Sequence, residues 1–191
     1  MQLGEEEKAI ELAEKAKEID SEDYTYEYLI GTAYVALRQY DESIAHLEKA
    51  LELAPNHSQI YGNLGTAYLL KNDQTKSIEM YKKAIEIEPE NTEALYNLGS
   101  LYQIQNNHSE ACVYFEKAYA IKNDEKSLVG LTLSEFKGGN YTKAIEHYKA
   151  LVIAHPEKDS YLYNLATCYE QVRDFNNAIS ILKQLITRNP N

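Results

Sequence analysis

The chain contains five histidines and two cysteines, residue types that often act as metal ligands, general bases or nucleophiles. No two histidines lie three or four positions apart, the spacing that places two metal ligands on one face of a helix. The sequence also lacks a glycine-rich phosphate loop and a serine nucleophile elbow. Its carboxylates alternate with lysines, as in Glu79 with Lys82 and Lys83, which is typical of a solvated helix face. We therefore expect no catalytic site, no metal site and no cofactor.

A second group of polar residues could bind a partner without doing chemistry. Three asparagines are each followed three residues later by a hydroxyl residue, and tyrosines recur just before them: Asn63, Asn97, Asn164, Thr66, Ser100, Thr167, Tyr28, Tyr96 and Tyr163. A side-chain amide offers a donor and an acceptor, so a column of asparagines can pair with a peptide backbone regardless of its sequence. Exposed tyrosines serve as interface anchors. These nine residues are the candidate site for a peptide or protein partner.

The elements that position these residues follow from a period of 34 residues. The residues that keep this period are Ala16, Ala50, Ala84 and Ala118, then Gly31, Gly65 and Gly99, and then Tyr34, Tyr68 and Tyr102. After a single 33-residue step from Ala111, the register continues at Ala144 and Ala178. The four prolines share one position of the unit: Pro55, Pro89, Pro156 and Pro190. A fixed period of this length predicts one supersecondary unit stacked end to end.

The period divides the chain into five repeats, which cover residues 24–57, 58–91, 92–124, 125–158 and 159–191. Residues 1–23 align with the second half of a repeat and are expected to form an N-terminal cap. Cys112 and Cys168 occupy positions that hold isoleucine or alanine in other repeats, so both are predicted to be small buried hydrophobic residues.

Each repeat is predicted to form two amphipathic helices, because apolar residues recur at spacings of three and four. The second helices are expected to begin at a short polar N-cap residue: Asp41, Thr75, Ser109, Thr142 and Asn176. The first helices are expected to begin near Asp23, Ser58, Thr92, Asp124 and Asp159. The glycines at 31, 65 and 99 would let the two helices of a unit approach closely, opposite Ser43, Ser77 and Ala111.

These residues resemble the tetratricopeptide repeat family over nearly the whole chain. The second repeat carries the family pattern as Tyr61, Leu64, Gly65, Tyr68, Ser77, Tyr81, Ala84 and Pro89. The resemblance implies an all-α fold, a right-handed α-solenoid of antiparallel helix pairs. It also implies a concave groove that binds extended peptides or partner helices, lined by the side of the first helices that carries the asparagines.

The asparagine column resembles the ladder in the repeat superhelix of O-linked N-acetylglucosamine transferases, with breaks at Leu29 and Gly130. Two alternatives to a peptide-binding site remain open. Asn-Leu-Gly is also the commonest sequence at these positions of the repeat, and the tyrosines could pack in the core. The family's carboxylate clamp for chaperone C-termini needs basic groove residues. The chain has Tyr28, Gln59, Asn63, Glu93 and Asn97 at those positions, so a chaperone clamp is disfavoured.

The net charge of −11 argues against nucleic acid as a partner, because an acidic surface repels phosphates. No apolar run is long enough to cross a membrane, and the first residues lack a signal peptide. A cytoplasmic location is therefore favoured.

The leading hypothesis is a non-catalytic scaffold that binds a peptide or partner segment in its concave groove. One alternative is the substrate-recognition arm of a larger enzyme, such as a glycosyltransferase like the one named above. Another is a scaffold that self-assembles through its open ends, with Ile181, Leu185 and Ile186 of the last helix covered by a neighbouring molecule.

Overall fold

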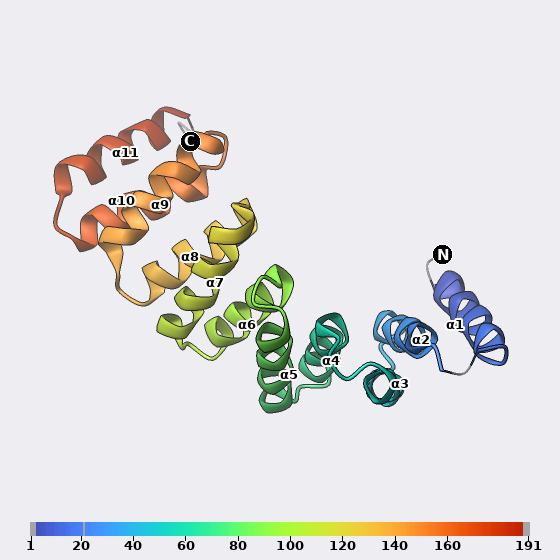
Figure 1. The fold of residues 1–191 in the computed structure, drawn as a ribbon. Coiled ribbons are helices and arrows are strands. Elements are labelled where there is room, and N and C mark those ends of the chain that lie inside the picture. Colours follow the sequence, from blue (N-terminus) through green and yellow to red (C-terminus); the bar gives the residue numbers. More distant parts are fainter. Residues whose placement is uncertain (1–2, 21, 189–191) are drawn as a thin grey trace. The chain divides into compact units, whose positions relative to one another are not determined.

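The computed structural model describes residues 3–20 and 22–188, and within them all regular structure is helical (Figure 1). The eleven helices of this part of the chain form antiparallel pairs, so the predicted all-α class and solenoid type of fold are confirmed. The chain divides into two compact units, one reaching Leu98 and the other starting at Gly99, and each is described by itself. Pro190, the last of the in-register prolines, lies outside the described residues.

The first unit contains α1 (Leu3–Lys17), α2 (Tyr24–Ala36), α3 (Tyr40–Leu53), α4 (Ser58–Leu70), α5 (Gln74–Ile87) and the first half of α6 (Thr92–Ile104). Each of the helices α1 to α4 packs on the next one along the chain. The core between α3 and α4 buries Leu47, Ala50, Ile60, Leu64 and Ala67.

The second unit contains the rest of α6 followed by α7 (His108–Lys122), α8 (Glu125–Lys137), α9 (Tyr141–Ala154), α10 (Asp159–Gln171) and α11 (Phe175–Arg188). Its core lies where α9 meets α8 and α10, and includes Ile145, Tyr148, Leu151 and Leu165. The repeat boundaries stay a prediction.

The glycines of the first helices sit where two helices of a pair come into contact. A Cβ atom on Gly65 would lie 2.7 Å from the ring of Tyr81, and one on Gly31 would lie 2.7 Å from the side chain of Leu47. Ser77 also donates a hydrogen bond to the carbonyl oxygen of Gly65, at 2.7 Å. The expected close approach is therefore present at both glycines, with the large side chains of Leu47 and Tyr81 opposite them, and at Gly65 the expected small residue Ser77 is also in contact.

The predicted N-caps of the second helices lie two residues too late. Asp73 caps α5 by accepting a hydrogen bond from the backbone N–H of Lys76, and Asn107 caps α7 through the N–H of Glu110. The residue before each second helix's cap has a left-handed backbone, with φ between 59° and 79°: Arg38, Asn72, Asn106, Gly139 and Arg173. This conformation reverses the chain within a single residue, so the second helix begins sooner than the polar residues suggest.

The 33-residue step corresponds to the connection between α7 and α8. Helix α7 continues to Lys122, Asn123 is left-handed with φ of 51°, and Asp124 caps α8 through the N–H of Ser127. The connection from α3 to α4 instead uses four residues, 54–57, including Pro55. A helix that is one residue longer and a loop that is two residues shorter account for the missing residue. None of the helices among the described residues combines the length and the apolar character needed to cross a bilayer.

Candidate functional site

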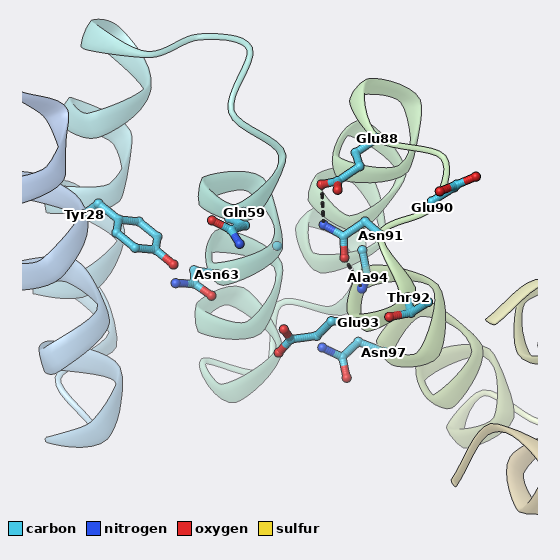
Figure 2. Close-up of a pocket in the computed structure, with 11 residues that line it drawn as sticks. Tyr28, Gln59, Asn63, Glu88, Glu90, Asn91, Thr92, Glu93, Ala94 and Asn97 are labelled. Atoms are coloured by element: carbon cyan, nitrogen blue, oxygen red, sulfur yellow. Dashed lines mark hydrogen bonds between the residues drawn. The ribbon is translucent and has the colours of Figure 1, made fainter. Parts of the chain in front are cut away.

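A polar cleft of about 270 Å³ lies in the first unit, where α2, α4 and the start of α6 face one another. Tyr28 comes from α2, Gln59 and Asn63 come from α4, and Glu93 and Asn97 come from α6. Figure 2 shows the Tyr28 hydroxyl pointing toward Gln59 and Asn63, with Glu93 and Asn97 on the facing helix. Three of the nine predicted residues, Tyr28, Asn63 and Asn97, therefore line one cleft.

The cleft is open because Gly62 has no side chain. Gly62 shares its repeat position with Tyr28, Tyr96, Val129 and Tyr163, and it lines the cleft. A Cβ atom on Gly62 would meet no heavy atom within 4 Å, so packing does not require a glycine here. Gly62 is not among the nine predicted site residues, although aligning the repeats shows a glycine where three other repeats place tyrosine.

The side-chain amide of Asn63 forms one hydrogen bond within the fold. Its Nδ2 donates a hydrogen bond to the hydroxyl of Thr32 on α2, at 3.0 Å, which links neighbouring first helices. The described residues give the carboxamide oxygen of Asn63 no donor. An incoming N–H group could therefore bind to that oxygen.

Thr66 and Asn97 are engaged with Tyr81, which is buried. The Thr66 hydroxyl lies 3.0 Å from the Tyr81 hydroxyl, and it also donates to the carbonyl oxygen of Gly62 at 3.2 Å. Burial raises the pKa of Tyr81, and hydrogen bonds with Thr66, Ser77 and Asn97 oppose that rise. At the equivalent position, burial raises the pKa of the Tyr148 phenol to about 12, and the nearby amide of Asn164 opposes that rise. Two members of the asparagine column, Asn97 and Asn164, thus lie near the tyrosine hydroxyl of the preceding unit.

The cleft is acidic. Glu88, Glu90 and Glu93 line it, no lysine or arginine does, and none of the three carboxylates forms a salt bridge within residues 3–20 and 22–188. Asn91 lies among them, with its Nδ2 3.5 Å from Glu88 and its Oδ1 accepting the N–H of Ala94, as drawn in Figure 2. A ligand with a positive charge would complement this lining.

The predicted residues of the last repeat line a different groove. Tyr163 and Thr167 lie on α10, where they border an apolar groove of about 390 Å³ between α10 and α11. Thr167 donates to the carbonyl oxygen of Tyr163 at 3.0 Å, and Tyr163 is largely exposed. Tyr96 and Ser100 lie on α6 and line neither the polar cleft nor this groove.

The exposed face of the last helix differs from the predicted one. Ile181 is partly buried against the core of the second unit, and Leu185 is half-buried. Phe175, Ile179 and Leu182 are exposed together with Ile186. The predicted exposed face is therefore wrong for Ile181 and Leu185. Residues 175, 179, 182 and 186 form one stripe along the helix, and residues 181 and 185 lie beside that stripe.

Two pairs of a buried glutamate with a half-buried histidine were not anticipated from the sequence. His46 and His147 share one repeat position, and their Nδ1 atoms lie 2.6 Å from Glu27 and 2.7 Å from Glu135. Burial raises the pKa of Glu27, but hydrogen bonds from Lys17 and His46 outweigh this and leave it below its ordinary value. The hydrogen bond with Glu135 raises the pKa of His147. Each of the two carboxylates is thus hydrogen-bonded to a histidine of the neighbouring helix and stabilises the contact between the two helices.

The two cysteines occupy positions on the packed faces of their helices, as small apolar residues would. Cys168 is buried, Cys112 is half-buried, and both are free thiols. Burial raises the pKa of each to about 11, so both remain protonated and unreactive near neutral pH.

Family models match most of the chain. A tetratricopeptide repeat model matches residues 22–90, a second one matches residues 80–113, and the model of anaphase-promoting complex (cyclosome) subunit 3 matches residues 104–185. The chain belongs to the tetratricopeptide repeat family. No curated protein sequence matches it.

Several solved structures share the fold. YrrB, described as a tetratricopeptide repeat protein with an unusual peptide-binding site, is 22% identical, with a TM-score of 0.82, over 94% of this chain and 93% of that one. MamA is 23% identical with a TM-score of 0.77, covering 89% and 93%. A repeat protein from Cytophaga hutchinsonii is 18% identical with a TM-score of 0.82, covering 96% and 74%. At these identities the likeness is one of fold.

Proposed function

We propose that this tetratricopeptide repeat chain is a non-catalytic interaction module that binds an extended, basic peptide segment in the polar cleft of its first unit. The peptide backbone would hydrogen-bond to the amides of Gln59, Asn63 and Asn97. A lysine or arginine side chain would lie beside the carboxylates of Glu88, Glu90 and Glu93. The ring of Tyr28 would pack against the peptide at one side.

The observation that carries this proposal is the open space at Gly62. A glycine inside a helix is about 1 kcal/mol less favourable than alanine, so a glycine without a packing reason lowers stability. Three other repeats place tyrosine at this position, so the fold accepts a large side chain there. The missing side chain lets a ligand approach the backbone of α4 directly, where Asn63 and Gln59 can reach it. YrrB, which has the same fold and a described peptide-binding site, supports a peptide as ligand.

The test is a selection from a random 12-residue peptide library displayed on phage, followed by fluorescence anisotropy with the enriched peptides. We expect the enriched peptides to carry lysine or arginine and to bind more weakly as salt is raised. Gly62→Tyr fills the cleft with a side chain that other repeats carry, so it should abolish binding while the helix content stays unchanged.

Two further variants separate the contributions of charge and shape. Glu93→Gln should weaken binding of a basic peptide by up to about fivefold, the value of one exposed ion pair. Gly62→Ala adds one methyl group and should have a much smaller effect than Gly62→Tyr. Selected peptides that bind Gly62→Tyr as well as they bind the wild type would overturn the proposal, and so would a selection that enriches acidic peptides.

A further inference from the structure

Asn91 lines the polar cleft, but its side-chain nitrogen is already engaged within the fold. Its Nδ2 donates a hydrogen bond to the hydroxyl of Ser58 at 2.7 Å, and Glu88 Oε2 lies 3.5 Å from the same nitrogen. Its Oδ1 accepts the backbone N–H of Ala94 at 2.9 Å, which makes Asn91 the N-cap of α6 (Figure 2). The nitrogen has two protons and each has an acceptor, so it has no proton left to donate to a ligand.

The hydrogen bond with Ser58 connects Asn91 to two further helices. Ser58 is the first residue of α4, and its hydroxyl donates to the carbonyl oxygen of Ala84, in the last turn of α5, at 3.1 Å. Ser58 is 7% exposed, Ala84 is fully buried, and neither lines the cleft. The hydrogen bonds of Asn91 and Ser58 therefore join the starts of α4 and α6 to the end of α5.

The starts of α4 and α6 carry the two facing walls of the cleft. Gln59 directly follows Ser58, and Asn63 lies one turn further along α4. Glu93 is the second residue of α6, and Asn97 lies one turn beyond it on the same face. A shift of the start of α6 relative to α4 would therefore move Glu93 and Asn97 together and change the width of the cleft.

Other repeats connect the same two positions with different side chains. Lys158, which precedes α10, donates a hydrogen bond to Glu125 at the start of α8, at 2.6 Å, and the two residues are 33 positions apart, as in the pair at the cleft. The rings of Tyr24 and His57, at the starts of α2 and α4, have centroids 4.9 Å apart. Neither His57 nor Lys158 caps the helix that follows it through its side chain. At the cleft, one residue both caps its helix and connects it to α4.

We propose that Asn91 is a positioning residue of the polar cleft, which holds the start of α6 against α4 so that Glu93 and Asn97 face Gln59 and Asn63. This inference rests on the function proposed above for the cleft. The connection fixes both walls before the peptide arrives, so binding does not have to order them. Asn91 itself donates no hydrogen bond to the peptide.

Two substitutions break the connection from opposite ends. Ser58→Ala removes the acceptor and leaves every residue that lines the cleft in place. Asn91→Ser removes the donor and keeps a good N-cap residue. Each should weaken the binding of a fluorescently labelled hexalysine peptide to the intact chain by about three- to tenfold, the value of one hydrogen bond, as measured by anisotropy. The double variant should bind no more weakly than either single variant, because all three lose the same hydrogen bond.

A matched control separates positioning from stability. Glu125→Gln combined with Lys158→Met breaks the equivalent connection at the start of α10 without changing the net charge, and neither residue lines the cleft. This variant should unfold at lower urea concentration but bind hexalysine as the wild type does. Amide hydrogen exchange, followed by mass spectrometry, provides a measurement that needs no ligand. Ser58→Ala should speed exchange in the first two turns of α6, and the control should not.

The outcomes distinguish this inference from the proposed function. If hexalysine does not bind the wild type, or binds Gly62→Tyr equally well, the proposed function is wrong and this inference is wrong as well. If Gly62→Tyr abolishes binding while Ser58→Ala and Asn91→Ser bind as tightly as the wild type, only the positioning role is wrong. Equal weakening by the control variant would also overturn it, since lost stability would then explain the effect, and so would unchanged exchange of α6 in Ser58→Ala.

Discussion

Alanine substitutions at Gly65 and Gly62 of α4 should change stability in opposite directions. Both glycines lie within one helix, so alanine at either position gains about 1 kcal/mol of helix propensity. At Gly62 the new methyl group meets no heavy atom within 4 Å, and the variant should be more stable by about that amount. At Gly65 it would lie 2.7 Å from two ring atoms of Tyr81, a side chain that is almost fully buried.

The ring of Tyr81 cannot move away without loss. Relieving the contact requires a shift of about 1 Å in a close-packed core, and overpacking of this kind costs about 1 to 3 kcal/mol. The hydrogen bond between Tyr81 and Thr66 also opposes a shift. After the gain in propensity, Gly65→Ala should be less stable than the wild type by up to about 2 kcal/mol, and less stable than Gly62→Ala by about 1 to 3 kcal/mol.

The assay is urea unfolding followed by far-ultraviolet circular dichroism. Repeat arrays do not always unfold in one step, so the midpoints of the two variants are compared directly and the slopes are checked for agreement. Equal midpoints for Gly65→Ala and Gly62→Ala would refute the reasoning, because the two variants differ only in what the new methyl group meets.

Two further predictions concern the turn before α11 and the half-buried His147 of α9. Arg173 has φ of 62°, a left-handed conformation that costs a residue with a side chain about 1 to 2 kcal/mol. Arg173→Gly removes this cost and should therefore raise the midpoint of urea unfolding. Arg173→Ala keeps the cost, so its midpoint should be lower than that of the glycine variant. The hydrogen bond with Glu135 raises the pKa of His147 in the folded chain. The Glu135–His147 pair should therefore stabilise the fold fully below the ordinary histidine pKa of about 6.5. This stabilisation should be lost as the pH rises through the pKa that His147 has in the folded chain. The stability difference between wild type and His147→Gln, measured by urea unfolding, should therefore shrink from about pH 6 to pH 8, and a difference that grows over this range would contradict the assignment.

The class of fold and the helix pairs could be predicted from the residues alone, because repetition shows which residues are equivalent and helical spacing shows which of them share a face. The glycines at 31 and 65 and the caps Asp23 and Asp124 are examples, since each acts through neighbours that are close along the chain or at a fixed offset. The caps of the second helices were misplaced because a left-handed residue in the turn leaves little sequence signal when it is an arginine, as at Arg38 and Arg173.

The candidate sites needed the tertiary structure. The sequence nominated Asn63 and Asn97 together, but only packing shows that Asn63 donates a hydrogen bond to Thr32 and that Asn97 lies near the buried hydroxyl of Tyr81. Likewise, Ile181 and Ile179 are both apolar residues of one helix, and only the position of the core shows which of them is exposed. Equivalence between repeats is a property of the chain alone, whereas the atoms that an equivalent residue meets depend on the side chains of neighbouring helices. For that reason the period identified the surface, and packing decided which of its groups remain open to a partner.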